Sequence, residues 1–112
     1  MLIYKIFRRP EWDDLVATGE TLGAPVDLAD GYIHFSTAQQ VMETAARHFA
    51  TESDLVLVAV DSDALGSALK WEPSRNGALF PHLYRALRRS DVVWDKSLPL
   101  GASGHIFPER LV

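Results

Sequence analysis

The chain has 112 residues and a formal charge of −4 at pH 7, from 11 Lys and Arg against 15 Asp and Glu. Hydrophobic residues make up 47% of it and charged residues 23%, which excludes disordered and fibrous classes and suits one globular domain over residues 1–112. The acidic balance provides no basic surface for phosphate contacts, so we expect no nucleic-acid partner.

Membrane and secretory signals are not expected in this chain. The longest apolar run, residues 55–60, is far shorter than the roughly 18 residues of a membrane span. At the N-terminus the charges follow the apolar residues, which reverses the order of a secretory signal. The chain has no cysteine, so disulfides, thiolate nucleophiles and cysteine zinc sites are excluded. We expect a cytoplasmic monomer without a membrane partner.

The N-terminal third predicts a strand, a helix and a long connection. Residues 3–7 favour a strand, Pro10 suits the first turn of a helix, and Gly19 supplies its C-terminal stop. The buried face of this helix is expected to carry Trp12, Leu15 and Val16. Residues 20–30 are expected to form a loop, with Gly23, Pro25 and Asp27 as breakers. A loop of this length is a candidate for lining a site.

A short strand and a second helix are expected next. Residues 31–36 are aromatic and favour a strand, and Thr37 with Gln40 three residues later forms a capping-box signature. The buried stripe of the helix that follows is expected to carry Val41, Met42, Ala45 and Phe49.

The rest of the chain is richer in strands. Residues 55–60 lack polar alternation, which predicts an interior strand, and Asp61 or Ser62 can cap a short helical turn that Gly66 ends. Pro81 indicates a sheet edge or a bulge. The remaining expected segments are strands over 69–72, 79–84 and 92–98, a turn over 73–77 and a tail over 101–112. This order predicts an α+β fold with helices packed on a mixed or mostly antiparallel sheet.

The first candidate site lies on the strand over residues 31–36. Alternation places Tyr32, His34 and Ser36 on one face, away from Ile33 and Phe35. The strand leads into a helix N-terminus, where backbone N–H groups favour an anion beside Ser36. The alternative is that Thr37 only caps the helix and His34 only bonds a neighbour.

The second candidate site lies on the strand over residues 79–84. Phe80, His82 and Tyr84 share one face, and Pro81 cannot donate to a ladder, so one edge should stay open for a ligand. The alternative is an amphipathic edge strand whose His82 meets water.

Two further candidates surround the turn over residues 73–77. Glu72 follows Trp71, and burial against an indole would raise the pKa of this carboxyl group, as acid–base catalysis requires. Arg75 could hold a phosphate or carboxylate through its guanidinium fork. The alternatives are a solvent-facing strand end and an ordinary surface arginine.

Metal and nucleotide-loop motifs do not stand out. His34, His82 and Glu72 could form an open ligand set, but the histidines are 48 residues apart and no closely spaced histidine pair exists, so we expect no metal site. The chain also lacks the nucleophile elbow, the dinucleotide-binding glycine motif and the P-loop.

Five segments in chain order resemble the bacterial family called domain of unknown function 952. These segments are Tyr4-Lys5-Ile6, Gly31-Tyr32-Ile33-His34-Phe35-Ser36-Thr37, residues 54–60, Trp71-Glu72-Pro73 and Phe80-Pro81-His82-Leu83-Tyr84. The resemblance implies an ADP-ribosyltransferase-like fold, in which a split, mostly antiparallel sheet surrounds an NAD-sized cleft. It brings no established activity.

A more distant resemblance concerns the RNA 2′-phosphotransferases of the same fold. Ile33-His34-Phe35-Ser36 is similar to their Val-His-Leu-Ser strand. Many members of the superfamily place Tyr-His-Gly-Thr on the first strand to hold the nicotinamide ribose, whereas this chain has Tyr4-Lys5-Ile6-Phe7. NAD is therefore a candidate cofactor without its usual first-strand motif.

These observations predict a polar cleft that binds a nucleotide-like or other anionic small molecule. Glu72 and His34 are the catalytic candidates for group transfer, with Glu72 as acid or base. The ligand-binding candidates are Ser36, Arg75, His82 and Tyr84. The alternative is a non-catalytic small-molecule-binding or regulatory module that has lost NAD chemistry.

Overall fold

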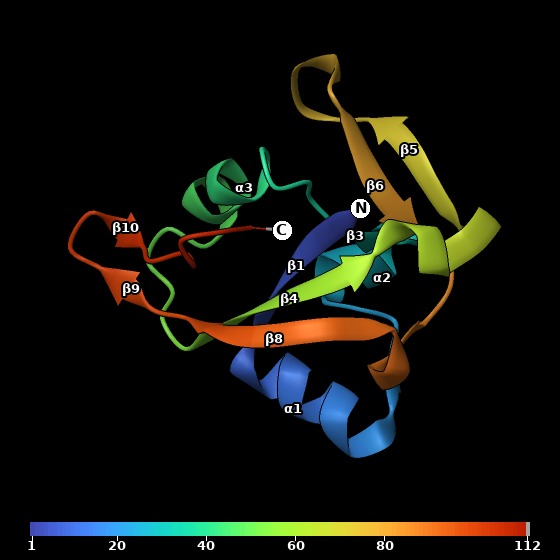
Figure 1. The fold of residues 1–112 in the computed structure, drawn as a ribbon, viewed down its shortest axis with the longest axis horizontal. Helices are drawn as coiled ribbons and strands as arrows, with labels where there is room; N and C mark the ends of the chain where they lie inside the picture. The colour runs from blue at the N-terminus through green and yellow to red at the C-terminus, as the bar shows by residue number, and fades with distance from the viewer. Residues whose placement is uncertain (112) are drawn as a thin grey trace.

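Strand β4 (Leu55–Asp61) forms the centre of the molecule (Figure 1). The structure is a computed structural model that describes residues 1–111, except for the side chain of Arg75. β4 pairs antiparallel with β1 (Leu2–Arg8) on one side and with β8 (Val92–Leu98) on the other. The expected interior strand over residues 55–60 is confirmed, because all six of these residues are buried.

A second antiparallel sheet carries His34 and His82. Its order is β3 (Ile33–His34), β6 (Leu79–Leu83) and β5 (Leu69–Pro73). The expectation of an edge strand at residues 79–84 is wrong, because β6 lies in the middle of this sheet.

Pro81 nevertheless limits the length over which β3 pairs with β6 in the second sheet. Its carbonyl accepts a hydrogen bond from the backbone N–H of Phe35, at 3.0 Å, but its ring nitrogen has no hydrogen to return. β3 therefore ends at His34, and the chain crosses to the first sheet, where Ser36 forms an isolated bridge with Tyr4.

Three α-helices pack around the sheets. α1 (Arg9–Thr18) begins with Pro10 in its first turn and ends at Gly19, as expected. α3 (Val41–His48) begins four residues after Thr37, and the Gln40 side chain accepts a hydrogen bond from the Thr37 backbone N–H. The third helix, α2 (Pro25–Asp30), lies where a loop was expected.

The remaining elements are short. Asp61 caps the helical turn that follows β4 by accepting a hydrogen bond from the Asp63 backbone N–H. Two short strand pairs were not expected: β2 (Glu20–Thr21) pairs with β7 (Leu87–Arg88), and β9 (Leu100–Gly101) pairs with β10 (Gly104–His105). Of these strands, β2 lies in the segment expected to be a loop and β10 in the expected tail. The 3₁₀ turns span Ser62–Ala68, Arg75–Gly77 and Arg89–Asp91.

The first sheet has a hydrophobic layer on each face, because alternate β4 residues point to opposite sides. Val56, Val58 and Val60 pack with residues of α1 and the second sheet. Leu55, Leu57 and Ala59 pack on the other side, with residues of α3. These layers place α1 and α3 on opposite faces of the sheet (Figure 1).

Two side chains expected in the core are instead exposed. Val16 of α1 and Met42 of α3 face solvent, whereas Leu15 and Val41 beside them are buried. Each helix therefore buries a narrower stripe than the sequence predicts. Within residues 1–111, no helix has the length and apolar character that a membrane crossing requires.

The two-sided burial of β4 generates a stability prediction. Leu57→Ala should lower the free energy of unfolding by about 3 kcal/mol, because the side chain is fully buried and the cavity cannot close completely. Val93→Ala on β8 removes a side chain that is 55% exposed and should cost no more than about 0.5 kcal/mol. Urea unfolding measures both values, and equal losses would contradict the assigned layers.

Candidate functional site

The two histidines expected at separate sites lie next to each other. His34 of β3 and His82 of β6 are directly paired in register, and their ring centroids are 5.3 Å apart. Directly opposed residues of an antiparallel pair project to the same face of the sheet. The register therefore brings together two imidazoles that are 48 residues apart in the sequence.

Tyr32 stacks against both imidazoles. Its ring centroid lies 4.2 Å from that of His82, 4.6 Å from that of His34 and 5.2 Å from that of Tyr84. The alternation of residues 31–36 predicts that Tyr32 lies on the same face as His34. Its contacts with the rings of His82 and Tyr84 depend in addition on the register between β3 and β6. We call Tyr32, His34, Glu72, His82 and Tyr84 the histidine cluster.

Glu72 of β5 joins the cluster through two hydrogen bonds. Its Oε1 lies 2.9 Å from Nδ1 of His82 and accepts a 2.6 Å hydrogen bond from the Tyr84 hydroxyl. The Tyr84 and His82 hydrogen bonds lower the pKa of Glu72, which is the opposite of the increase that burial against Trp71 would cause. The same hydrogen bond to Glu72 raises the pKa of Tyr84 to about 12.

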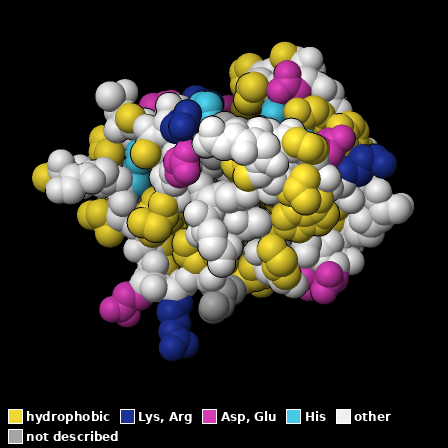
Figure 2. Space-filling view, turned by 90° about the horizontal axis from the view of Figure 1, so that it is seen from above, with side chains coloured by type: hydrophobic (Ala, Val, Ile, Leu, Met, Phe, Trp, Pro, Cys, Tyr) yellow, Lys and Arg dark blue, Asp and Glu magenta, His cyan; other side chains and the backbone are white. Residues whose placement is uncertain are grey.

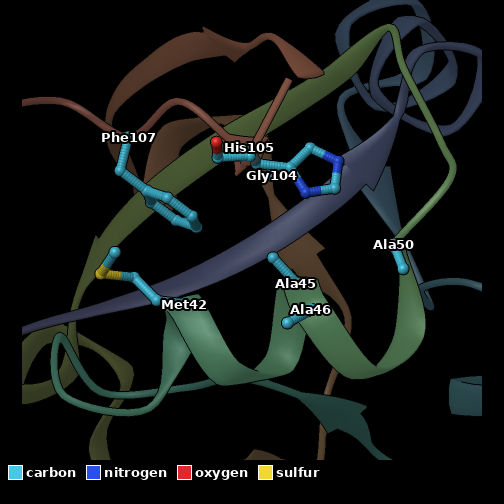
Figure 3. A pocket seen from close by; sticks show the side chains of 8 residues that line it. Met42, Ala45, Ala46, Ala50, Gly104, His105 and Phe107 are labelled. Atoms are coloured by element: carbon cyan, nitrogen blue, oxygen red, sulfur yellow. The ribbon is translucent and has the colours of Figure 1, made fainter. Parts of the chain in front are cut away.

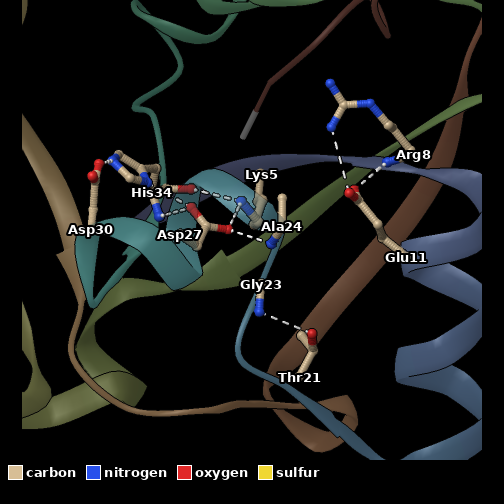
Figure 4. A network of polar contacts seen from close by, with 9 residues as sticks. All are labelled: Lys5, Arg8, Glu11, Thr21, Gly23, Ala24, Asp27, Asp30 and His34. Carbon is tan, nitrogen blue, oxygen red and sulfur yellow. Dashed lines mark hydrogen bonds and ion pairs between the residues drawn. The ribbon is translucent and has the colours of Figure 1, made fainter.

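His34 is held by a second carboxylate, that of Asp27 on α2 (Figure 4). Asp27 Oδ1 lies 2.6 Å from His34 Nδ1 and accepts a 3.1 Å hydrogen bond from the His34 backbone N–H. The side chain and the backbone of His34 are thus held by the same oxygen, which fixes the orientation of the ring.

Asp27 is itself a buried ion, paired with Lys5 of β1. Its Oδ2 lies 2.8 Å from Lys5 Nζ and accepts a 2.8 Å hydrogen bond from the Ala24 backbone N–H. Burial alone would raise the pKa of Asp27. The His34 hydrogen bond, the charge and hydrogen bond of Lys5, and the Ala24 N–H outweigh burial and lower the pKa to about 2.

Sequence reasoning placed neither Asp27 nor Lys5 in the site. Asp27 was expected to be a loop breaker and Lys5 a residue of the first strand. The available signal was Pro25 two residues before Asp27 and Gly31 four residues after it, a spacing typical of a short helix. Nothing in the spacing shows that β1 would bring Lys5 to this carboxylate.

Ser36 lies apart from the other site candidates, and the prediction for the Arg75 side chain falls outside the described residues. Ser36 is buried, and its Oγ lies 2.9 Å from the Thr44 hydroxyl of α3, so its polar partner is the helix and not the histidine cluster. Arg75 lies in the 3₁₀ turn Arg75–Gly77, and its side chain is outside the described part of the protein.

Access to His82 is narrow, because its side chain is only 4% exposed. Among the described residues, the Tyr4 hydroxyl is the single buried side-chain polar atom without a hydrogen-bond partner. Nδ1 of His82 bonds Glu72, whereas Nε2 has no partner among the described side chains and is not a fully buried atom, so Nε2 retains some contact with the surface.

Two surface hollows lie away from the cluster. One of about 240 Å³ separates α3 from the C-terminal hairpin, where Met42, Ala45, His105 and Phe107 face one another (Figure 3). The other, of about 330 Å³, is lined by residues near Arg9 and Pro99.

Hydrophobic side chains gather in several groups on one face of the molecule, with charged side chains scattered among them (Figure 2). No group of three metal-ligating side chains occurs among the described residues.

The buried Asp27 charge predicts a pH dependence of stability. Because the folded-state pKa, about 2, lies below the ordinary value of 3.8, ionised Asp27 stabilises the fold above pH 4. This stabilisation, about 2 kcal/mol, is lost as the pH falls towards 2. Asp27→Asn should lower the unfolding free energy at pH 7 by about 3 kcal/mol, because Lys5 stays buried without its carboxylate.

Urea unfolding at several pH values measures this effect. The difference between wild type and Asp27→Asn should be constant above pH 4 and shrink below it. Asp13→Asn changes an exposed carboxylate on α1 and controls for net charge. A difference that does not depend on pH would contradict ionic pairing of Asp27.

Gly23 offers an independent test of the Asp27 position. A Cβ atom at Gly23, whose φ is +99°, would lie 2.7 Å from Asp27 Cβ, whereas one at Gly19, whose φ is +90°, would meet nothing within 4 Å. Both Ala variants carry similar backbone strain. Gly23→Ala should therefore lose at least about 1 kcal/mol more than Gly19→Ala and shift the NMR signals of the His34 ring. Equal losses with an unchanged His34 spectrum would contradict the packing described.

Comparisons with known proteins place the chain in a family. The model of a family described as a protein of unknown function, DUF952, matches residues 6–95. The crystal structure of protein CC0527 from Caulobacter crescentus is 52% identical with a TM-score of 0.90, over 94% of this chain and 92% of that one.

Two further structures of CC0527 are similar. The crystal structure of a double mutant has a TM-score of 0.90 at 50% identity, over 94% of this chain and 92% of that one. The solution NMR structure has a TM-score of 0.84 at 53% identity, over 93% of this chain and 90% of that one. No curated protein matches the chain. Since the family model matches well over half of the residues, the chain belongs to the DUF952 family of proteins of unknown function.

Proposed function

We propose that the histidine cluster binds a nucleotide-like, anionic small molecule. The observation that carries this proposal is the juxtaposition of His34 and His82 with two tyrosine rings, one of which is 41% exposed. Two imidazoles can donate N–H groups to a phosphate or carboxylate, and a phenol ring offers a stacking face for a base. Such a mixture of charge-bearing and flat apolar groups matches the chemistry of a nucleotide.

Glu72 suits a supporting role beside His82, because its lowered pKa keeps the carboxylate ionised where it faces Nδ1 of the ring. Because Glu72 accepts from Nδ1 of His82, Nε2 is left to face a ligand, as in a carboxylate–histidine pair that transfers protons. Ionised Glu72 can also accept a hydrogen bond from a ribose hydroxyl group. These features support His82 as a further catalytic candidate beside Glu72 and His34.

The architecture is compatible with the ADP-ribosyltransferase-like fold that the sequence resemblance implies, and we propose NAD as a candidate substrate. Two antiparallel three-stranded sheets meet near the cluster, at the bridge between Tyr4 and Ser36. In the proposed group transfer, the bond between ribose C1′ and the nicotinamide nitrogen breaks, and its electron pair leaves with neutral nicotinamide. An acceptor oxygen bonds to C1′ and loses its proton to Nε2 of His82, whose other nitrogen Glu72 holds.

A second function, a non-catalytic binding module, is favoured by two observations. The Tyr32 ring covers His82, whose side chain is almost fully buried. The first strand, where the wider superfamily often carries a ribose-binding motif, instead directs Tyr4 into the core and Lys5 to buried Asp27. Under this alternative the cluster binds a ligand and performs no transfer.

Calorimetric titration with AMP and with NAD tests the binding proposal. His82→Gln keeps a side-chain N–H for Glu72 but removes the ring, and it should weaken binding about 10-fold, equivalent to about 1.4 kcal/mol. His48→Gln changes an exposed histidine on α3 and should leave the affinity unchanged. Tyr84→Ala, which removes a ring that is 41% exposed and offers a stacking face, should also weaken binding and serves as a second variant should His82→Gln unfold. Affinities that do not differ among these proteins would overturn the proposal.

Nicotinamide release from NAD separates catalysis from binding alone. Release by the wild type that Glu72→Gln abolishes, while AMP still binds, would establish group transfer. Binding of AMP without any release would favour the binding module.

A further inference from the structure

Both ring nitrogens of His34 already face carboxylates. Nδ1 lies 2.6 Å from Asp27 Oδ1, and Nε2 lies 3.0 Å from Asp30 Oδ2 (Figure 4). Only the imidazolium form of the ring supplies an N–H donor to each of these oxygens. A ligand anion can therefore reach a nitrogen of His34 only by replacing one of the two carboxylates.

The two carboxylates differ in how firmly they are held. The Asp27 side chain is fully buried and is held by Lys5, by two backbone N–H groups and by the ring itself. The Asp30 side chain is 44% exposed, and its ion pair with His34 is its only one among the described residues. Asp30 is thus the carboxylate that can leave.

The position of Asp30 in α2 has no evident benefit for the helix. It is the last residue of α2 and precedes Gly31, which ends the helix in the left-handed conformation. A negative charge at a helix C-terminus is unfavourable beside the carbonyl groups that lack partners there. The contact with His34, four residues further along the chain, is the interaction that this side chain does make.

Resting on the proposed function, we infer that the Asp30 carboxylate is an internal occupant of the anion-binding position at His34 Nε2. The anionic group of the ligand, a phosphate or a carboxylate, displaces Asp30 and accepts the same N–H. Asp30 then sets the affinity of the site, because each binding event must first break its contact with His34. Its charge also repels an anion that approaches Tyr32, whose pKa is raised by burial and by the charges of Asp30, Glu72 and Asp27.

Titration with inorganic phosphate and with AMP, followed by the NMR signals of the His34 ring, tests this inference. Asp30→Ala should bind both anions about five-fold more tightly than the wild type, since exposed ion pairs of this kind are weak competitors. Asp30→Asn should show a smaller gain, because its amide oxygen still accepts from Nε2 without the charge. Asp13→Asn, with the same change in net charge on α1, should bind like the wild type.

The gain must also depend on His34. In the double variant Asp30→Ala with His34→Gln, which lacks the His34 ring and is therefore titrated by calorimetry beside the single variants, the tighter binding should disappear. Equal or weaker binding by both Asp30 variants overturns the inference, as does a gain that survives the loss of His34 or that Asp13→Asn reproduces. Failure of both Asp30 variants to fold would assign Asp30 a structural role and would overturn it as well.

The same titrations distinguish the two proposals. If the wild type binds AMP in a manner that His82→Gln weakens, while the Asp30 variants match the wild type, only the role of Asp30 fails. If none of the proteins binds either anion, the proposed function of the cluster fails with it.

Discussion

A single buried carboxylate, that of Asp27, connects three separate segments of the chain. It accepts from the backbone and ring of His34, from the Ala24 N–H at the start of α2 and from Lys5 of β1. A buried charge is costly unless hydrogen bonds and an opposite charge compensate it, and here both are present. The first sheet, α2 and the second sheet are thereby held in one arrangement, and the orientation of the His34 ring depends on it.

The two histidines have different surroundings in consequence. His34 bonds a buried carboxylate on one side and an exposed one on the other. His82 bonds Glu72 through one nitrogen, and the other nitrogen has no partner in the described part of the protein. In this pair, Nε2 of His34 faces the exposed Asp30 carboxylate, whereas Nε2 of His82 has no described partner. The Tyr32 ring stacks against both imidazoles. Under the proposed function, Nε2 of His34 holds the anion of the ligand and Nε2 of His82 moves a proton.

Much of the fold could be predicted from the sequence, because the strands are long and strongly patterned. The apolar run of residues 55–60 identified the central strand, and Pro10 with Gly19 bounded α1. α2 could not be recognised by periodicity, because six residues span less than two turns. Val16 and Met42 were assigned to the core because helical spacing does not reveal how wide a stripe the neighbouring sheet covers.

The site could be predicted only in part. Alternation along two strands placed His34, His82 and Tyr84 on faces that the structure brings together, and Glu72 joined them from the neighbouring strand. Ser36 does not join these residues as alternation predicted, because its backbone pairs with Tyr4 of the first sheet and not with β6. The pKa direction of Glu72 could not be predicted, since it depends on two donors that only the folded chain supplies.

Pro81 has a consequence for how the two sheets are joined. A residue with an N–H at this position could complete a second hydrogen bond with Phe35 and lengthen β3 along β6. Such an extension would compete with the bridge between Ser36 and Tyr4, through which the segment after His34 reaches the first sheet. Because Pro81 has no N–H, β3 stops after His34 and the chain crosses from the second sheet to the first. His34 and His82 therefore lie close to the junction of the two sheets.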